Sequence, residues 1–217
     1  AMIRWMLLFI AGLVLHQPAA ADEWWAWGWL ELWQRPGQSA GVFLANRDDI
    51  EDGAWVQQVA PRYRFTLTPW LDSALHLSLL NIEDITSNER HWQLRPELEL
   101  NPHYELGPHL RIDWRNRMEW RWNERESLKQ SRFRHRLQLG WALPPSFGCW
   151  TRIFVSNEWL VNLDRGQWTE NRVVPLGLTF KTGARSELDL FYMIVSTQPE
   201  ETWRHESVLG TYLRVKF

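Results

Sequence analysis

The sequence predicts an all-β protein, a closed antiparallel up-and-down transmembrane β-barrel of about ten strands. Three observations predict this fold. Apolar residues alternate with charged ones over long segments, connections alternate between short and long, and an export signal stands at the N-terminal end. A β-strand points alternate side chains to opposite faces, so an alternating segment has one apolar and one polar face. In a barrel that spans a membrane, the apolar face meets lipid and the polar face lines the lumen.

The first 21 residues have the organisation of a secretory signal peptide. Arg4 precedes an apolar run from Met6 to Leu15, and Ala19-Ala20-Ala21 provides an Ala-x-Ala cleavage site. The apolar run is too short to span a bilayer, which needs about 20 residues. We therefore expect cleavage after Ala21, with residues 1–21 as the signal peptide and residues 22–217 as a barrel domain in the outer membrane of a Gram-negative cell.

Tryptophan is in large excess, with 17 in 217 residues, and its ring prefers the headgroup zone of a membrane. The mean hydropathy of -0.41 would suit a soluble protein, but it also suits a membrane barrel, because only every second strand residue meets lipid. A tryptophan-rich soluble core is the alternative. The net charge of -2 argues against nucleic acid as a partner. The single cysteine, Cys149, excludes an internal disulfide, and we expect it to be a small buried side chain.

The clearest strand begins at Leu110. A largely apolar face runs from Leu110 to Trp122, and the positions between its members, from Arg111 to Arg121, are all charged. The segment from Arg132 to Leu143 alternates in the same way, and both are long enough to cross a membrane as tilted strands of about 9–11 residues. The other strands are expected within Glu23 to Trp33 and over Trp55 to Leu67, Ala74 to Asn81, Trp92 to Leu100, Trp150 to Asn162, Arg172 to Lys181, Ser186 to Thr197 and His205 to Phe217.

The connections between these strands alternate in length. The short set, rich in Pro and Gly, comprises Thr68 to Trp70, Leu106 to Pro108, Pro144 to Gly148 and Thr182 to Ala184. The longer set comprises Gln34 to Gly53, Glu83 to Arg90, Asn123 to Gln130, Leu163 to Glu170 and Gln198 to Arg204. Outer-membrane barrels have short periplasmic turns and longer external loops. With ten strands and a periplasmic N-terminus, the short turns and both termini are expected on the periplasmic side.

The C-terminal segment resembles the assembly signal of Gram-negative outer-membrane β-barrels, which also end a strand on an aromatic residue. Counted back in twos from Phe217, Val215 and Leu213 continue one apolar face, while Lys216 and Arg214 lie on the other. The resemblance implies that Leu213, Val215 and Phe217 are read by the barrel assembly machinery. Outer-membrane lipid is the other expected partner.

Two neighbouring strands resemble a known family. The segments 116–121 (Asn-Arg-Met-Glu-Trp-Arg) and 132–137 (Arg-Phe-Arg-His-Arg-Leu) are similar to the paired strands of a bacterial family of unknown function. That family consists of small exported proteins thought to be outer-membrane barrels. The resemblance covers the mature chain in length and strand spacing, and these two strands are its specific part. It implies the architecture and no activity.

The charged faces are expected to line the lumen, where charges must be paired and hydrogen-bonded. An eight-stranded barrel is filled by side chains and a wide porin needs about 16 strands, so a ten-stranded lumen is expected to hold a salt-bridged plug or at most a narrow passage. The predicted lumen network comprises Arg62, Arg64, Arg95, Glu97, Glu99, Arg111, Asp113, Arg115, Arg117, Glu119, Arg121, Arg132, Arg134, Arg136, Glu158 and Asp189.

The function that these features favour is non-enzymatic, in a small outer-membrane barrel with a lumen filled by charged side chains. One alternative is a narrow, porin-like solute channel. The other is a hydrolase of outer-leaflet lipid, because His205 and Ser207 share the lipid face and are similar to the His-x-Ser pair of barrel lipid A deacylases. Two polar residues at a wet strand end are the explanation that we favour for this pair. The dispersed histidines and the lack of a Gly-rich phosphate loop predict no metal and no cofactor.

Overall fold

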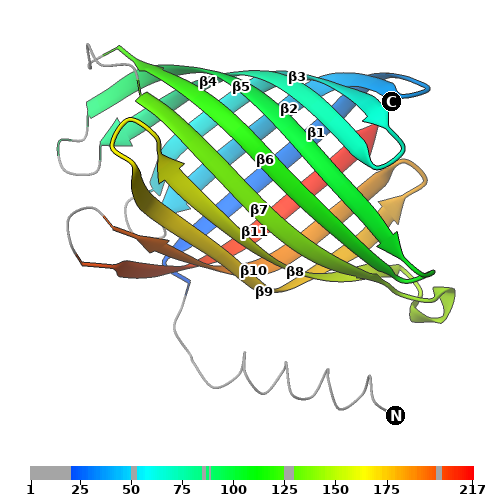
Figure 1. The fold of residues 1–217 in the computed structure, drawn as a ribbon. Coiled ribbons are helices and arrows are strands. Elements are labelled where there is room, and N and C mark those ends of the chain that lie inside the picture. Colours follow the sequence, from blue (N-terminus) through cyan, green and yellow to red (C-terminus); the bar gives the residue numbers. More distant parts are fainter. Residues whose placement is uncertain (1–20, 50–52, 85–86, 88, 125–129, 199–201) are drawn as a thin grey trace.

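The computed structural model describes residues 21–49, 53–84, 87, 89–124, 130–198 and 202–217, which form a closed barrel of eleven strands (Figure 1). The predicted fold class, a closed all-β barrel of about ten strands, is confirmed. The strands pair in chain order, and β11 closes the barrel against β1. Their bounds are β1 (Glu23–Arg35), β2 (Gln38–Asp49), β3 (Gly53–Thr68), β4 (Leu71–Asp84), β5 (Glu89–Leu106), β6 (Leu110–Asn123), β7 (Gln130–Ala142), β8 (Trp150–Asn162), β9 (Gln167–Gly183), β10 (Ser186–Thr197) and β11 (Arg204–Lys216), with a 3-10 turn η1 (Pro145–Phe147) before β8.

The strand that the sequence pattern missed is β2, which lies inside the segment predicted as a long loop from Gln34 to Gly53. Its inward positions include the small residues Ser39, Gly41 and Ala45, and its outward positions are also mostly small or apolar. The two faces therefore differ little in polarity, and the strand shows no alternation of apolar and charged residues. Gly37, with a φ of 72°, provides the left-handed backbone of the tight turn that joins β1 to β2.

The odd number of strands makes the closing pair parallel. Glu23 lies opposite Val208, and eight residues later Glu31 lies opposite Lys216, so β1 and β11 run in the same direction. The expectation that both termini lie on one side of the barrel is therefore wrong. Asp22 lies at one end, and Phe217 lies at the other, where β11 ends beside β1 (Figure 1).

The short connections do gather at one end, the end that holds Phe217. We call it the short-turn end, and the opposite end, at which β1 begins, the long-loop end. At the short-turn end the connections 36–37, 69–70, 107–109 and 184–185 contain only two or three residues, and 143–149 is longer. The connections at the long-loop end are shorter than predicted, because strands such as β5 and β9 extend well beyond the segments that alternate clearly.

Three strands contain a proline, which cannot donate a hydrogen bond to a neighbouring strand. Around Pro61 the pairing of β3 with β4 skips from Val59 to Arg62. The same interruption occurs between β5 and β6 next to Pro96 and again at Pro102, and between β9 and β8 at a bulge that contains Pro175. Each proline is thus accommodated where the pairing with one neighbour lapses.

The outer surface of the barrel is apolar, as a lipid-facing surface must be. Exposed leucines, valines and isoleucines form a band around the middle, and exposed aromatic residues lie toward both ends, as the aromatic girdles of membrane barrels do. This arrangement argues against the soluble alternative, in which the apolar faces would fill the core. Cys149 is also exposed, because it lies in the connection before β8 and not in a strand, so the expectation of a buried filler is wrong. The band includes Leu44, Val59, Leu75, Leu77, Leu79, Leu98, Leu100, Leu137, Leu139, Val155, Leu190, Ile194, Leu209 and Leu213. The aromatic residues are Trp24, Trp92, Trp120, Trp122, Trp168 and Trp203 toward the long-loop end and Trp33, Tyr63, Trp70, Tyr104, Trp114, Trp141, Phe147, Trp150 and Phe217 toward the short-turn end.

The inner surface has two unlike halves. Strands β3 to β9 carry most of the charged side chains that point inward. An apolar cluster lies on β1 and β8 to β11, and Trp27 and Tyr212 pack against it. Charges and apolar groups therefore share one lumen, in which each guanidinium needs a carboxylate or an aromatic ring as a partner. The apolar cluster comprises Trp25, Phe154, Val174, Phe191, Met193, Val195 and Val208.

Candidate functional site: the charged lumen

Three carboxylates of β5 and β6 lie in the middle of the lumen wall. Glu97 is 2% exposed, and Glu99 and Glu119 are fully buried. They point inward because they occupy alternate positions of strands whose intervening residues, such as Leu98 and Trp120, face outward. A buried carboxylate without partners would be strongly unfavourable. Each of these three groups therefore needs cationic, hydrogen-bonding side chains around it.

Glu99 is bound by arginines from both sides. The Arg62 Nη2 of β3 lies 2.7 Å from Oε2, and the Arg117 Nη2 and Nε of β6 lie 2.6 and 2.7 Å from Oε1. Arg117 also reaches Glu97, with its Nη1 2.8 Å from Oε2. One carboxylate on β5 thus connects three strands through its two oxygens.

Glu119 is the centre of a second group, nearer the long-loop end. Arg132 donates to its Oε2 from Nη2 at 2.8 Å, and Arg134 donates to its Oε1 from Nη1 at 3.1 Å. Arg95, Arg117 and Arg121 lie farther away, at 3.7, 3.8 and 3.9 Å. Five guanidinium groups around one carboxylate give this part of the lumen an excess of positive charge.

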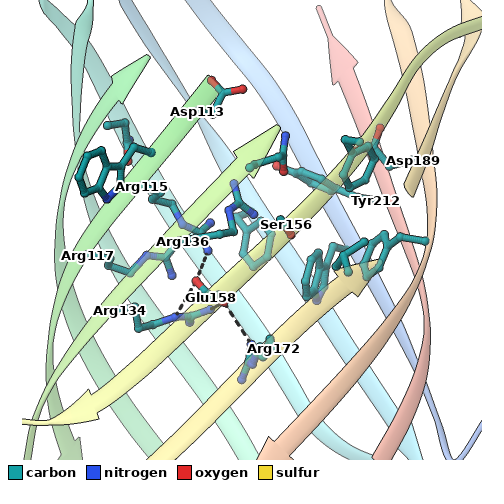
Figure 2. A pocket seen from close by; sticks show the side chains of 18 of the residues that line it. Asp113, Arg115, Arg117, Arg134, Arg136, Ser156, Glu158, Arg172, Asp189 and Tyr212 are labelled. Atoms are coloured by element: carbon teal, nitrogen blue, oxygen red, sulfur yellow. Dashed lines mark hydrogen bonds and ion pairs between the residues drawn. The ribbon is translucent and has the colours of Figure 1, made fainter. Parts of the chain in front are cut away.

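Glu158 of β8 joins the arginines of β6, β7 and β9 (Figure 2). Its Oε1 lies 2.6 Å from Arg115 Nη2, and its Oε2 lies 2.8 Å from Arg134 Nη2 and 4.0 Å from Arg172 Nη1. Arg134 therefore bridges Glu119 and Glu158. The ion pairs form a continuous chain across the lumen wall from β3 to β9.

A separate group lies toward the short-turn end. Asp189 of β10 accepts two hydrogen bonds from Arg214 of β11, at 2.6 and 2.7 Å, and a third from the Thr179 hydroxyl at 2.7 Å. Arg111 pairs with Asp113 and Glu105, each at 2.8 Å, but its side chain is 38% exposed and that of Glu105 is 59% exposed. Burial of the charges thus decreases toward this end of the barrel.

The structure places the sixteen residues of the predicted network on the lumen side and brings most of them into ion pairs. Two of them, Arg64 and Arg136, line the lumen cavity without an ion pair to any described residue. Sequence reasoning missed several charged members of the lumen. Arg214 could have been found, because the count from Phe217 already put it on the polar face, and Arg47 could not, because its strand was taken for a loop. The missed members include Arg47, Asp72, Arg152, Glu170, Arg172, Glu187 and Arg214.

A cavity of about 370 Å³ lies against this wall, and among the described residues eleven arginines and five carboxylates line it. A second cavity of about 470 Å³ shares Arg62, Arg64 and Arg214 with it and extends to Lys181, Arg185 and Lys216 at the short-turn end. The lumen therefore has a cationic vestibule that opens at the short-turn end. Among the described residues, no group of three or more His, Cys, Asp and Glu side chains is arranged to hold a metal ion.

The structure does not join His205 and Ser207 as a nucleophile and a base. The His205 Nδ1 lies 2.8 Å from the hydroxyl of Ser196 on β10. The Ser207 hydroxyl donates to the carboxylate of Asp22 at 3.0 Å, and the Ser207 backbone N–H donates to the same carboxylate at 2.7 Å. His205 is thus engaged with β10, and Ser207 with the residue that precedes β1, where the barrel closes.

A closed barrel with an apolar outer band, aromatic girdles and a charged lumen defines a membrane-spanning β-barrel protein. Residues 44–206 match the family described as "Protein of unknown function (DUF2490)", and the chain belongs to that family. The resemblance seen in β6 and β7 is confirmed. No helix in the described part of the chain is long and apolar enough to cross a membrane.

Comparison with other proteins adds little to this assignment. No curated protein matches the chain. Among solved structures, an anion-selective porin from Comamonas acidovorans matches with a TM-score of 0.43 and 11% sequence identity, over 83% of this chain and 54% of the porin. The chain thus spans about half of the length of that porin.

Proposed function

We propose that the protein is a small, non-enzymatic barrel of the Gram-negative outer membrane, with a lumen closed by its own ion pairs. The observation that carries the proposal is the complete burial of Glu99 and Glu119, each held by arginines from other strands. A water-filled channel at this level would expose these carboxylates. Each of these carboxylates, together with its arginines, joins three strands. The network therefore also holds the barrel in one shape.

The proposal includes the location and the export route. A cleaved signal peptide of residues 1–21 would direct the chain out of the cytoplasm. The short turns of outer-membrane barrels face the periplasm, so the short-turn end, with Phe217 and the cationic vestibule, would face the periplasm too. Asp22, which directly precedes β1, would then lie at the outer surface.

The two alternatives are less well supported. A porin-like channel needs a water path lined by charges, whereas the central arginines of this lumen are engaged with buried carboxylates. A lipid hydrolase needs His205 to activate Ser207, whereas these side chains hydrogen-bond to Ser196 and Asp22.

Planar-bilayer recording tests the closed lumen. We expect the purified protein, inserted into a planar bilayer, to give no steady conductance, and a 16-stranded porin inserted in the same way serves as the positive control. An Arg117→Ala, Arg134→Ala double variant removes two arginines that hold the central carboxylates, and it should show conductance steps that the wild-type protein lacks. Steady anion-selective conductance by the wild-type protein, with a selectivity that Arg117→Ala alters, would overturn the proposal in favour of the channel.

A further inference from the structure

Two arginines of the lumen wall face one another directly. Arg115 of β6 lies opposite Arg136 of β7 in the strand register. Like charges that lie directly opposite on one face of a sheet are destabilising. In addition, the Nε atoms of both side chains are buried and have no hydrogen-bond partner. The pair therefore has unused donors and uncompensated charge.

The neighbouring carboxylates neutralise Arg115 through Glu158 and leave the charge of Arg136 uncompensated. Glu158 lies opposite Arg136 in the register, but its oxygens are bound by Arg115 and Arg134. Asp113 is engaged by Arg111 at 2.8 Å. Arg136 forms no ion pair with any residue that the structure describes, and the Glu99 oxygen nearest to the Arg115 Nε is 3.9 Å away.

The pair borders open space. Arg115, Arg136 and the hydroxyl-bearing Ser156 all line the cavity of about 370 Å³, and Figure 2 shows the two guanidinium groups gathered near Glu158 on its wall. A water molecule occupies about 30 Å³ of liquid volume, so the cavity has room for a tetrahedral oxyanion together with several waters. Glu158, Arg117 and Arg134 of the ion-pair network line the same cavity, and we call the part of the cavity beside Arg115 and Arg136 the recess.

The route to the recess is also cationic. The vestibule at the short-turn end carries Lys181, Arg185 and Lys216 in addition to arginines of the cavity itself, and Glu31 and Glu187 are the carboxylates along it. A cleft lined mainly by one sign of charge raises the local concentration of ions of the opposite sign. Anions are therefore the solutes that this recess attracts.

We propose that the recess between Arg115 and Arg136 binds a small oxyanion, such as phosphate or sulfate, that enters from the short-turn end. A guanidinium group presents a planar fork of N–H donors that matches two oxygens of such an anion. The bound anion separates the two like charges and accepts hydrogen bonds from N–H groups of the two guanidinium groups. The inference rests on the proposed function only in that the ion-pair network closes the recess on its inner side.

Unfolding in the presence of phosphate tests this site. The folded protein in non-ionic detergent is titrated with inorganic phosphate at constant ionic strength, with chloride as the balancing anion, and the midpoint of thermal unfolding is measured. An anion that binds only the folded state raises this midpoint in a saturable way. In Arg136→Gln, we expect a higher midpoint without phosphate, because the like-charge contact is gone, and no response to phosphate. The matched control, Arg165→Gln, changes an exposed arginine outside the lumen and should respond like the wild-type protein.

Calorimetric titration with phosphate gives the affinity directly. We expect Arg136→Gln to weaken binding at least about tenfold, because charge-assisted hydrogen bonds are lost. If Arg136→Gln does not fold, Arg136→Lys keeps the charge, removes the planar fork and should also bind more weakly than the wild-type protein. Acetate in place of phosphate distinguishes a carboxylate site from a tetrahedral one: tighter acetate binding would overturn the assignment to phosphate or sulfate.

Two results would overturn the site as a whole: no saturable effect of phosphate on the wild-type protein, or an Arg136 variant that responds as Arg165→Gln does. Neither result touches the closed lumen, which the conductance measurement tests separately. Conversely, a conducting barrel that still shows phosphate-dependent stabilisation through Arg136 would end the closed-lumen proposal and leave the anion site intact.

Discussion

The ring of Phe191 on β10 lies over Gly210 on β11, so close that a Cβ atom at Gly210 would come within 3.0 Å of it. Phe191 and Gly210 are direct partners in the strand register. The same alternation of a glycine and an inward aromatic residue continues across six neighbouring strands. In a narrow barrel, small residues beside large ones let the side chains fit the strongly curved inner surface. The residues in this row, from β7 through β11 to β1, are Gly140, Phe154, Gly177, Phe191, Gly210 and Trp25.

Gly210→Ala should destabilise the barrel, because the added methyl group must displace the Phe191 ring. We expect the free energy of unfolding to fall by about 1–3 kcal/mol, as other overpacking changes do. Gly28→Ala is the control, because the nearest atom to an added Cβ there is Leu44 Cβ at 3.8 Å, an ordinary contact. Urea unfolding in lipid vesicles, followed by tryptophan fluorescence, measures both variants. Equal stabilities of the two variants would mean that the ring moves aside without cost.

Glu119→Ala should be far more harmful than the loss of an exposed carboxylate. It removes the nearest carboxylate of Arg132 and leaves Arg134 with Glu158 alone, and breaking a buried pair costs about 3–5 kcal/mol. Glu105→Ala is the matched control, because the pair that it forms with Arg111 is exposed and such pairs contribute about 0–1 kcal/mol. The comparison uses the same unfolding measurement. Similar losses in the two variants would show that the centre of the lumen is hydrated.

Deletion of Phe217, or Phe217→Ser, should reduce assembly into the membrane while export continues. The Phe217 side chain is 72% exposed on the lipid-facing side, so its removal costs little packing within the barrel. Its backbone N–H bonds to the Glu31 carbonyl at 3.1 Å, and Phe217→Ser retains this bond. The amount of folded protein in the membrane fraction is the measurement. Phe147→Ser, at an exposed aromatic residue of the same end, should assemble normally. Normal assembly of Phe217→Ser would show that the Phe217 side chain is not part of an assembly signal.

Cell fractionation should recover the protein in the outer membrane, in a form that migrates differently on gels before and after boiling. A closed barrel resists detergent until it is heated, because its strands leave no free edge. The N-terminal residue of the recovered protein should be Asp22 if the Ala-x-Ala site is used. Recovery of the protein only in the soluble periplasmic fraction would exclude the membrane assignment for the native cell.

The sequence determined which residues share a face, because alternation along a strand is a local property of the backbone. It therefore placed Glu97 and Glu99 on one face of β5 and Glu119 on the charged face of β6. It also located ten of the strands, and the bounds of β8 and β10 match the prediction. Where both faces of a strand were of similar polarity, as in β2, the local signal vanished and the strand was missed.

Only the tertiary structure decided how many strands close the barrel and which charges meet. The parallel pairing of β1 with β11 follows from the total strand number, which one unrecognised strand changes from even to odd. The partners of Glu99 come from β3 and β6, and the contact of Arg47 with the Trp25 ring, 4.1 Å from its centroid, joins β2 to β1. Such contacts depend on the register and stagger between strands, and these are set by closure of the whole sheet and by the volume of the side chains inside it. No segment of the chain carries that information alone, which is why the opposition of Arg115 and Arg136 became visible only when the barrel was closed.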